Sequence, residues 1–245
     1  MKTIYSSFRK LALLIYFLSF LFIFESCNNV VDSPVDQNSE VRGGIQSADW
    51  IMTVNTTFIN SFLDSVNLNV TANYDVDVYK IVYYSEDTKE NITVASGTLF
   101  IPKGVDDLPL ISLQHGTQTA RYKVGSVNPL NDAEGFLGAC QGYFTLVPDY
   151  LGLGESQIMH PYLYEKSSAD AVIDFIRACR KEAQELNIKL NGQVFLAGYS
   201  EGGYVTMAAD REIQLNYGDE ITVTVLRNGS QMDLQVTLGE RPSGQ

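Results

Sequence analysis

Alternating apolar and polar residues predict a pair of antiparallel strands in the first half of the chain. Residues 77–86 (DVYKIVYYSE) and 92–102 (ITVASGTLFIP) both alternate, and a polar turn separates them. Three shorter apolar runs predict buried strands: PLISLQ at 109–114, YFTLVP at 143–148 and QVFLAG at 193–198. Helix-like segments lie between these runs. Antiparallel strands followed by strands that alternate with helices are typical of an α/β fold, with a mostly parallel sheet covered on both faces.

Polar and apolar spacing places the helices between these strands. The stretch NDAEGFLGACQG, residues 131–142, suits a short helix. A longer helix is predicted to open at Ser167, with Asp170 three residues later as in a capping box. Apolar residues then recur on one face of that helix: Val172, Phe175, Ile176 and Cys179. A third helix is predicted to follow residue 200 and to end near Tyr217.

The C-terminal segment has the pattern of a β-hairpin. Two alternating runs flank Asn228-Gly229, a dipeptide typical of a two-residue hairpin turn. Pairing across this turn sets apolar residues opposite each other on one face: Val225 with Met232, Val223 with Leu234, and Ile221 with Val236. The other face carries polar residues: Thr222, Thr224, Asp233 and Gln235. A slip of one residue would destroy this match, so the register is predicted together with the hairpin.

The N-terminal residues 1–26 have the pattern of an export signal. Three basic residues among the first ten precede an apolar run at 11–24, which is short for a membrane span. Ser26 stands before Cys27, so the segment resembles a bacterial lipoprotein signal in which Cys27 becomes lipidated. An ordinary signal peptide of a secreted protein is the alternative. Residues 27–48 are predicted to form a polar tether that hangs the domain from the cell envelope.

Composition narrows the range of partners. The net charge is -12 and the pI about 4.5, so the phosphates of a nucleic acid would be repelled. Cys140 and Cys179 lie in apolar, helix-like contexts, and we expect two buried thiols. A disulfide between them is the alternative, which spacing does not decide. No Cys or His spacing typical of a metal site occurs, and we expect neither metal nor cofactor.

The segment VFLAGYSEGGYVTMAAD, residues 194–210, indicates how a serine could be presented for chemistry. Strand-like residues lead into Ser200, and a helix-like run follows it. A serine on a strained strand-to-helix turn needs small neighbours two residues away, and Gly198 and Gly202 meet that need. The N-terminus of the following helix would face a developing oxyanion. The alternative is a tight turn whose serine caps the helix.

Further segments bring a family resemblance. LISLQHGTQ, LVPDYLGLGES, AVIDFIRACR and VFLAGYSEGG occur in this order along the chain. As a set they resemble the α/β-hydrolase family, closest to its secreted lipase and esterase branch, over residues 70–217. The resemblance implies that Ser200 is the nucleophile of an acyl-serine mechanism. It also implies that the substrate is a carboxylic ester, a lipid or a peptide.

The same resemblance assigns the surrounding residues. It implies that the backbone N–H of Glu201 is one oxyanion donor and that the N–H of Thr117 or Gly116 is the other. His115 and Asp149, which follow two of the predicted strands, would organise the loops without reacting. All of these assignments carry over from the family's motifs to the matching positions of this sequence.

The general base is harder to find. The family places its acid and its histidine after the serine, whereas His115 and His160 both precede Ser200. His160 is a candidate non-standard base, although a base must itself be oriented by an acid. Asp210 lies ten residues along the helix, away from the active end. Without the family's acid and histidine, we expect catalysis by this chain to be very weak or absent.

The tail after Tyr217 resembles the last two strands of an HtrA-type PDZ domain more than the later strands of a hydrolase. The expected organisation is therefore a signal at 1–26, a tether at 27–48, an incomplete hydrolase domain at 49–217 and a hairpin tail at 218–245. Because crossover connections are right-handed, residues 221–226 are expected to lie parallel beside 193–198. Asp219 and Glu220 would be solvent-exposed turn residues.

Two other functions stay open. The chain could be a non-catalytic surface lipoprotein that binds a ligand through the cleft or the hairpin. It could also be a truncated or fused product with no stable function. The leading interpretation is a lipid-anchored serine esterase.

Overall fold

The computed structural model describes residues 41–217, 221–227 and 230–236, with side chains described as far as residue 214. The export signal, Cys27, Asp219, Glu220 and the turn at Asn228-Gly229 lie outside the described residues. The elements are β1 (Ile45–Val54), α2 (Thr56–Ser65), β2 (Val76–Glu86), β3 (Ile92–Pro102), β4 (Leu108–Gln114), η1 (Pro129–Asn131), α3 (Ala133–Cys140), β5 (Phe144–Pro148), α4 (Glu165–Glu185), β6 (Leu190–Gly198), α5 (Glu201–Tyr217), β7 (Ile221–Arg227) and β8 (Ser230–Val236).

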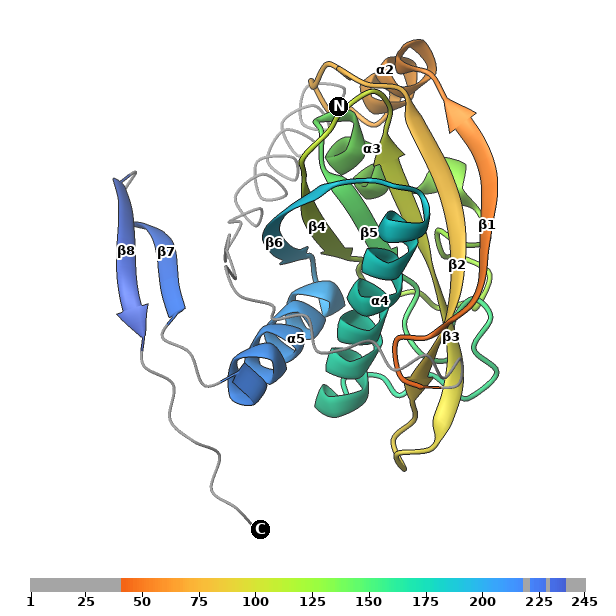
Figure 1. The fold of residues 1–245 in the computed structure, drawn as a ribbon, viewed down its shortest axis with the longest axis vertical. Helices are drawn as coiled ribbons and strands as arrows, with labels where there is room; N and C mark the ends of the chain where they lie inside the picture. Colours follow the sequence, from red (N-terminus) through yellow and green to blue (C-terminus); the bar gives the residue numbers. More distant parts are fainter. Residues whose placement is uncertain (1–40, 218–220, 228–229, 237–245) are drawn as a thin grey trace, which may run out of the picture.

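Six strands form one mixed sheet in the order β1-β2-β3-β5-β4-β6. The first three pair antiparallel, and β5 joins β3 antiparallel, whereas β4 pairs parallel with both β5 and β6. The sequence prediction of an antiparallel start followed by parallel strands is therefore confirmed. The carboxyl ends of β4, β5 and β6 lie at one edge of the sheet, where ligands bind in open α/β folds (Figure 1).

Helices cover both faces of this sheet. On one face α4 and α5 pack on the strands and on each other, through a core that includes Phe175, Val205 and Leu196 (Figure 1). On the other face α2 and α3 enclose a second core, which includes Ile59 and Phe136. Both Cys140 and Cys179 are buried free thiols in these cores, as predicted. The two cores fix the strands whose ends carry the candidate chemistry.

The N-terminal boundary of the domain differs from the prediction. A tether reaching residue 48 is wrong for the described part, because β1 begins at Ile45 and pairs with β2. Two irregularities in the register, at Ile45/Ser47 and Trp50/Met52, break the alternation that would have signalled a strand. The helix α2 that follows was also missed. Its Asn55 cap accepts a hydrogen bond from the N–H of Phe58 at 2.9 Å.

The start of α4 also differs. Ser167 does not open the helix, which begins at Glu165 after Tyr164, and no side chain caps it. The Ser167 hydroxyl donates instead to the carbonyl of Tyr164 at 3.3 Å. A serine inside the first turn can bond backward in this way, so its presence marks the helix start only approximately.

The C-terminal hairpin pairs in the predicted register. Val225 lies opposite Met232, Val223 opposite Leu234, and Ile221 opposite Val236. The prediction that this hairpin extends the main sheet beside β6 is wrong, because β7 and β8 form a separate two-stranded sheet. A strand beside β6 would be covered by helices and would favour a continuous apolar run. In the hairpin, the backbone N–H and C=O groups of β7 and β8 pair with each other. Closing the short loop between these strands has a low entropic cost.

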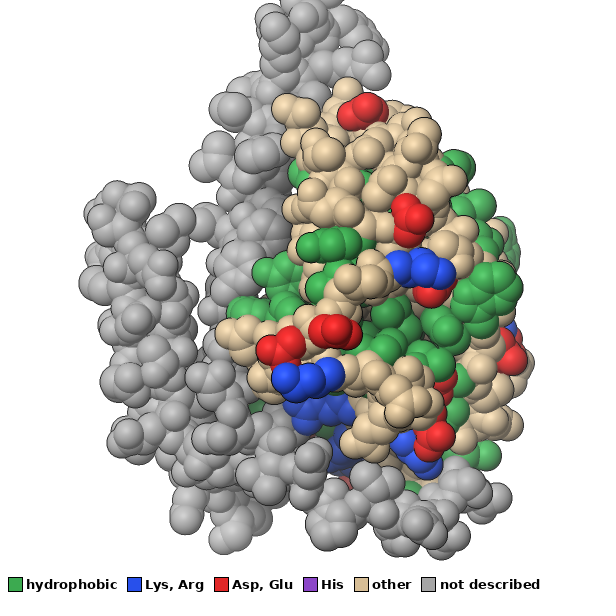
Figure 2. Space-filling view, turned by 45° about the horizontal axis from the view of Figure 1, so that its top comes forward, with side chains coloured by type: hydrophobic (Ala, Val, Ile, Leu, Met, Phe, Trp, Pro, Cys, Tyr) green, Lys and Arg blue, Asp and Glu red, His purple; other side chains and the backbone are tan. Residues whose placement is uncertain are grey.

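Charged side chains are intermingled on the face shown in Figure 2, where acidic and basic groups lie beside one another among apolar and uncharged surface. One mixed cluster is largely buried. Arg42 donates to Asp174 at 3.0 Å, to Asp170 at 2.6 Å and to Glu86 at 3.2 Å. The side chains of Asp170 and Asp174 are 2% and 0% exposed, so this cluster fixes the segment before β1 against α4.

Removing this guanidinium should be costly. We expect Arg42→Ala to lower the free energy of unfolding by about 3 kcal/mol, because it leaves buried carboxylates short of a partner. Urea unfolding followed by circular dichroism would measure the change. Arg211→Ala is the matched control: its partner Glu165 is about half exposed, and the expected loss is under about 0.5 kcal/mol. Equally small losses in both variants would contradict a structural role for the cluster.

Candidate active site

Ser200 occupies the corner between β6 and α5, as the sequence pattern predicts for a serine on a strained turn. Its φ of 57° lies in the left-handed region, which a residue with a side chain seldom adopts. The corner is closed by hydrogen bonds from the N–H of Gly202 to Tyr199 O at 2.8 Å and from Gly203 to Ser200 O at 3.0 Å. The Ser200 side chain is exposed at the carboxyl edge of the sheet.

Both flanking glycines are required by space. A Cβ on Gly198 would overlap the carbonyl group of Gly202, and a Cβ on Gly202 would overlap the carbonyl oxygen of Gln114. The corner therefore lies in direct contact with the end of β4. Tyr199 N–H also donates to Gln114 O at 3.3 Å, which fixes the corner to the same strand end.

The loop after β4 brings the second set of predicted residues to this corner. A Cβ built on Gly116 would lie 3.5 Å from the Ser200 Cβ, so the loop passes beside the serine. Within the described residues, no backbone hydrogen bond occupies the N–H of Gly116 or Thr117. At the start of α5 the N–H groups of Gly202 and Gly203 close the corner, whereas the described backbone hydrogen bonds include none from the N–H of Glu201. Free N–H groups from two elements thus flank Ser200.

His115 is held by its surroundings. Its Nδ1 lies 2.8 Å from Gly116 O and its Nε2 lies 3.3 Å from the backbone carbonyl of Asp149. The ring stacks on Tyr150 at 4.2 Å, and the Tyr150 hydroxyl donates to His115 O at 2.9 Å. These contacts join the loop after β4 to the loop after β5.

Asp149 is fully buried at the end of β5. Its carboxyl accepts from the Ser96 hydroxyl at 2.5 Å and from the N–H of Ser126 at 3.3 Å. Burial raises the pKa of this carboxyl, and these hydrogen bonds and the nearby His115 act in the opposite direction. Its side chain does not bond to either histidine, so it holds neighbouring loops together.

His160 reaches the site through Glu201 and not through the serine. Its Nε2 lies 3.0 Å from Glu201 Oε1, and its Nδ1 lies 2.7 Å from Leu151 O. No hydrogen bond joins the Ser200 hydroxyl to either histidine in the described part of the chain. Asp210 instead accepts from Gln214 one turn further along α5.

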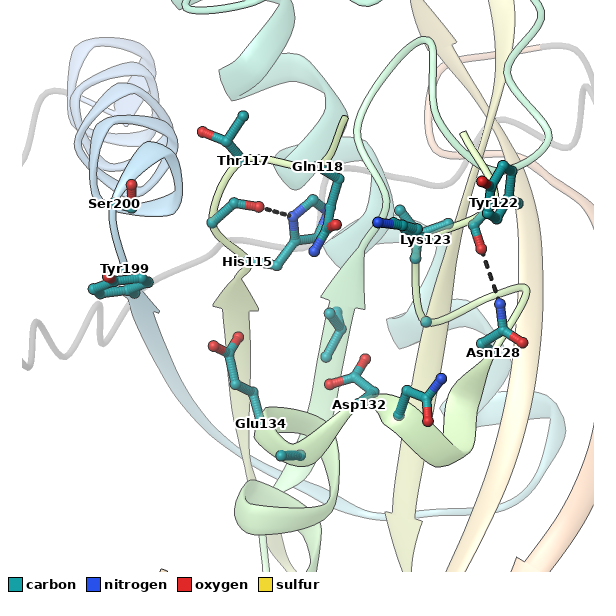
Figure 3. Close-up of a pocket in the computed structure, with 16 residues that line it drawn as sticks. His115, Thr117, Gln118, Tyr122, Lys123, Asn128, Asp132, Glu134, Tyr199 and Ser200 are labelled. Carbon is teal, nitrogen blue, oxygen red and sulfur yellow. Dashed lines mark hydrogen bonds between the residues drawn. The ribbon is translucent and has the colours of Figure 1, made fainter. Parts of the chain in front are cut away.

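A pocket of about 790 Å³ opens beside the serine. Figure 3 shows Ser200 and Tyr199 at one side, the loop carrying His115 and Thr117 above, and Asp132 and Glu134 below, at the start of α3. Polar groups line much of the remaining wall, including Lys123 and Asn128. Sequence reasoning missed Asp132 and Glu134. The acidic pair before an apolar helical run was a usable signal, since acidic residues favour helix starts.

Both missed carboxyl groups have perturbed acidity. Burial raises the pKa of Asp132 to about 7, although the side chain accepts from the N–H of Gly135 at 2.9 Å. Burial also raises the pKa of Glu134, against the effect of the nearby His115. Perturbed carboxyl groups in a pocket are typical of functional sites, although structural groups show them too.

No cluster of metal-ligating side chains occurs among the described residues. In the same part of the chain, no helix combines the length and the apolar composition that crossing a bilayer requires.

Comparison with known proteins agrees with this geometry. The profile of the secretory lipase family matches residues 137–234, which contain the corner and α5. The chain belongs to the α/β-hydrolase family. The matched part of the chain runs into β8, whereas the likeness of the tail to a PDZ domain stays a prediction.

Solved structures that resemble the chain at more than 30% identity include those of two proteins. The rice cell wall degrading esterase LipA from Xanthomonas oryzae is 34% identical, with a TM-score of 0.66 over 73% of this chain and 48% of LipA. A hydrolase from Legionella pneumophila is 31% identical, with a TM-score of 0.67 over 71% of this chain and 49% of that chain. The chain thus spans about half the length of these structures. No curated protein matches it.

The close contact at the Ser200 corner can be tested with two adjacent glycines. We expect Gly202→Ala to lower the free energy of unfolding by about 3 kcal/mol, because the new methyl group would overlap Gln114 O. Gly203→Ala is the control: its methyl group would lie 3.8 Å from Gly198 O, and alanine favours a helix by up to about 1 kcal/mol. Thermal unfolding of both variants would measure the difference between their stabilities. Similar stabilities would contradict the tight corner.

The raised pKa of Asp132 has a consequence for stability. A carboxyl that titrates near 7 in the folded hydrolase and near 3.8 unfolded holds its proton longer when folded. The free energy of unfolding therefore falls as the pH rises from about 4 to 7. Asp132→Asn keeps an acceptor for Gly135 but cannot ionise. We expect its stability relative to wild type to rise by roughly 1 kcal/mol between pH 4 and 8. If the free energies of unfolding of wild type and Asp132→Asn change in parallel with pH, this prediction is contradicted.

Proposed function

We propose that the protein is a serine hydrolase that cleaves carboxylic esters, with Ser200 as the nucleophile. The observation that carries this proposal is the left-handed corner at Ser200, with the loop of Gly116 beside it at the edge of a pocket. A serine presented in this way can approach a carbonyl carbon without steric hindrance from its own strand or helix.

In the proposed reaction the Ser200 Oγ attacks the ester carbonyl carbon and its proton is removed by a base. The carbonyl oxygen becomes an oxyanion, which accepts from the N–H of Glu201 and from that of Thr117 or Gly116. Collapse expels the alcohol and leaves an acyl-serine, which water then hydrolyses. The N-terminal end of α5 adds a favourable dipole at the same point.

In this proposal His115 and Asp149 act as loop organisers. The His115 ring is held by two backbone carbonyls and by stacking, and Asp149 is buried among hydroxyl and N–H donors. Both contact sets support a role in shaping the loops beside Ser200. Neither set places a titrating group on the serine hydroxyl, so we assign no general base to the described residues.

We propose an ester as substrate because the family profile is that of secretory lipases and a solved relative is named an esterase. The acyl or alcohol part would lie in the pocket between Tyr199, Thr117 and the start of α3. Export and attachment of the chain to a membrane through a lipid at Cys27 complete the proposal.

Replacing the nucleophile provides the test. We expect Ser200→Ala to abolish labelling by a fluorophosphonate and to lower the weak hydrolysis of a short p-nitrophenyl ester to background, because only the residual rate of a serine without its triad partners is lost. Labelling is read by intact-protein mass, and folding of the variant by circular dichroism.

Two controls sharpen this result. Ser61→Ala changes an exposed serine on α2 and should leave labelling unchanged. Labelling that persists in Ser200→Ala, or a folded wild-type protein that takes up no probe, would contradict the proposed nucleophile. The second result would favour a binding protein of the same fold.

A further inference from the structure

The residue directly after the proposed nucleophile carries a buried carboxyl group. The Glu201 side chain is only 2% exposed. Its Oε1 faces His160 Nε2 at 3.0 Å, and its Oε2 has no hydrogen-bond partner within the described residues. A carboxyl in such a place costs stability unless its one partner holds it firmly. His160 is that partner.

The hydrogen bonds of His160 require an additional proton. Its Nδ1 faces the carbonyl oxygen of Leu151 at 2.7 Å, and a carbonyl can only accept, so Nδ1 carries a hydrogen. In a neutral ring Nε2 then has a bare lone pair, and an ionised Glu201 would present a second lone pair to it. Two acceptors do not bond. One proton must therefore lie between Nε2 and Oε1.

This pair connects both arms of the proposed oxyanion hole. The His160 ring is parallel to Tyr150 within 11° at a centroid distance of 6.4 Å, and Tyr150 stacks in turn on His115. The Tyr150 hydroxyl fixes His115 O, beside the N–H groups of the loop after β4. At the other end of this row, His160 fixes the residue whose N–H begins α5.

The loop that carries His160 is packed tightly. Gly152 has a φ of 82°, and a Cβ there would overlap the backbone of His160. The titratable groups that face the pair are the hydroxyls of Tyr150, from the loop after β5, and Tyr162, whose ring meets His160 edge-on at 6.0 Å. Burial raises the pKa of Tyr150 well above its ordinary value, so it stays neutral.

We propose that His160 is a positioning residue, which holds Glu201 and its backbone N–H in place beside Ser200 through a hydrogen bond that contains one exchangeable proton. This inference rests on the proposed function. It replaces the assignment of His160 as a base, because both of its ring nitrogens are already engaged. Loss of this contact would leave the oxyanion donor without its side-chain support.

Four variants test the proposal through the rate of fluorophosphonate labelling of Ser200, measured from pH 5 to 10. In Glu201→Gln the amide N–H₂ donates to Nε2 of a neutral His160, so the contact needs no shared proton. We expect its rate to stay within about threefold of wild type near neutral pH. Glu201→Ala and His160→Ala should label about tenfold more slowly, a partial loss of one oxyanion donor. Glu165→Gln, on the exposed start of α4, should behave as wild type.

Three labelling results would overturn the proposal. His160→Ala labelling as little as Ser200→Ala would make His160 the base. Labelling of His160→Ala at the wild-type rate would show that His160 does not position Glu201. If Glu201→Gln is labelled as slowly as Glu201→Ala, a side chain that can still donate to His160 Nε2 does not maintain the labelling rate. The hydrogen bond between residues 201 and 160 would then not be what positions the oxyanion donor.

Nitrogen NMR of the imidazole rings separates this inference from the nucleophile. The chain has 2 histidines, so the spectrum of His160→Ala assigns both. We expect His160 Nδ1 to be protonated in wild type and in both Glu201 variants, and Nε2 to carry no hydrogen in Glu201→Gln and Glu201→Ala, in contrast to wild type at neutral pH. An unlabelled wild type with these signals would sink the proposed function and the positioning role while leaving the proton-sharing pair. A bare Nε2 in wild type at neutral pH would sink the pair.

Discussion

The site depends on the contact between the corner that carries Ser200 and the end of β4. Gly202 lies so close to the carbonyl oxygen of Gln114 that no side chain fits between them. This contact brings the first turn of α5 next to the loop that leaves β4. Because β4 lies inside the sheet, the corner inherits the rigidity of two buried cores, and a left-handed φ can be maintained there without relaxing.

Several acidic groups lie around this contact, and two of them, Asp149 and Glu201, are buried. Asp149 and Glu201 lie at the carboxyl edge of the sheet, and Asp132 lies at the start of α3 on the pocket wall. Each is retained by a small set of donors: hydroxyl and N–H groups for Asp149, the cap of α3 for Asp132, and His160 for Glu201. Removing these carboxyl groups from water costs free energy, but their hydrogen bonds favour one conformation of the loops over others. Burial raises the pKa of Asp132 and of Asp149, so the stability of the site depends on pH.

The polar row from His115 through Tyr150 to His160 links the loop after β4 to the loop between β5 and α4. Stacking and carbonyl contacts occupy the rings of both histidines in the described structure. These contacts support the proposed roles of His115 and His160 in positioning the loops. Proximity of residue types is weaker evidence for a catalytic role than the direction of their hydrogen bonds.

The sequence by itself determined the strands β2 to β6, the serine corner and the register of the hairpin, because each depends on local periodicity or on glycine at fixed spacing. It did not determine β1, whose irregular pairing hides the alternation, or the start of α4, where Ser167 bonds backward. It could not place the hairpin, since pairing with β6 depends on what covers both faces of a strand. Only the tertiary structure showed that Asp132 and Glu134 line the pocket and that His160 meets Glu201. Those contacts join residues up to 41 positions apart through the packing of separate loops, which no local pattern encodes.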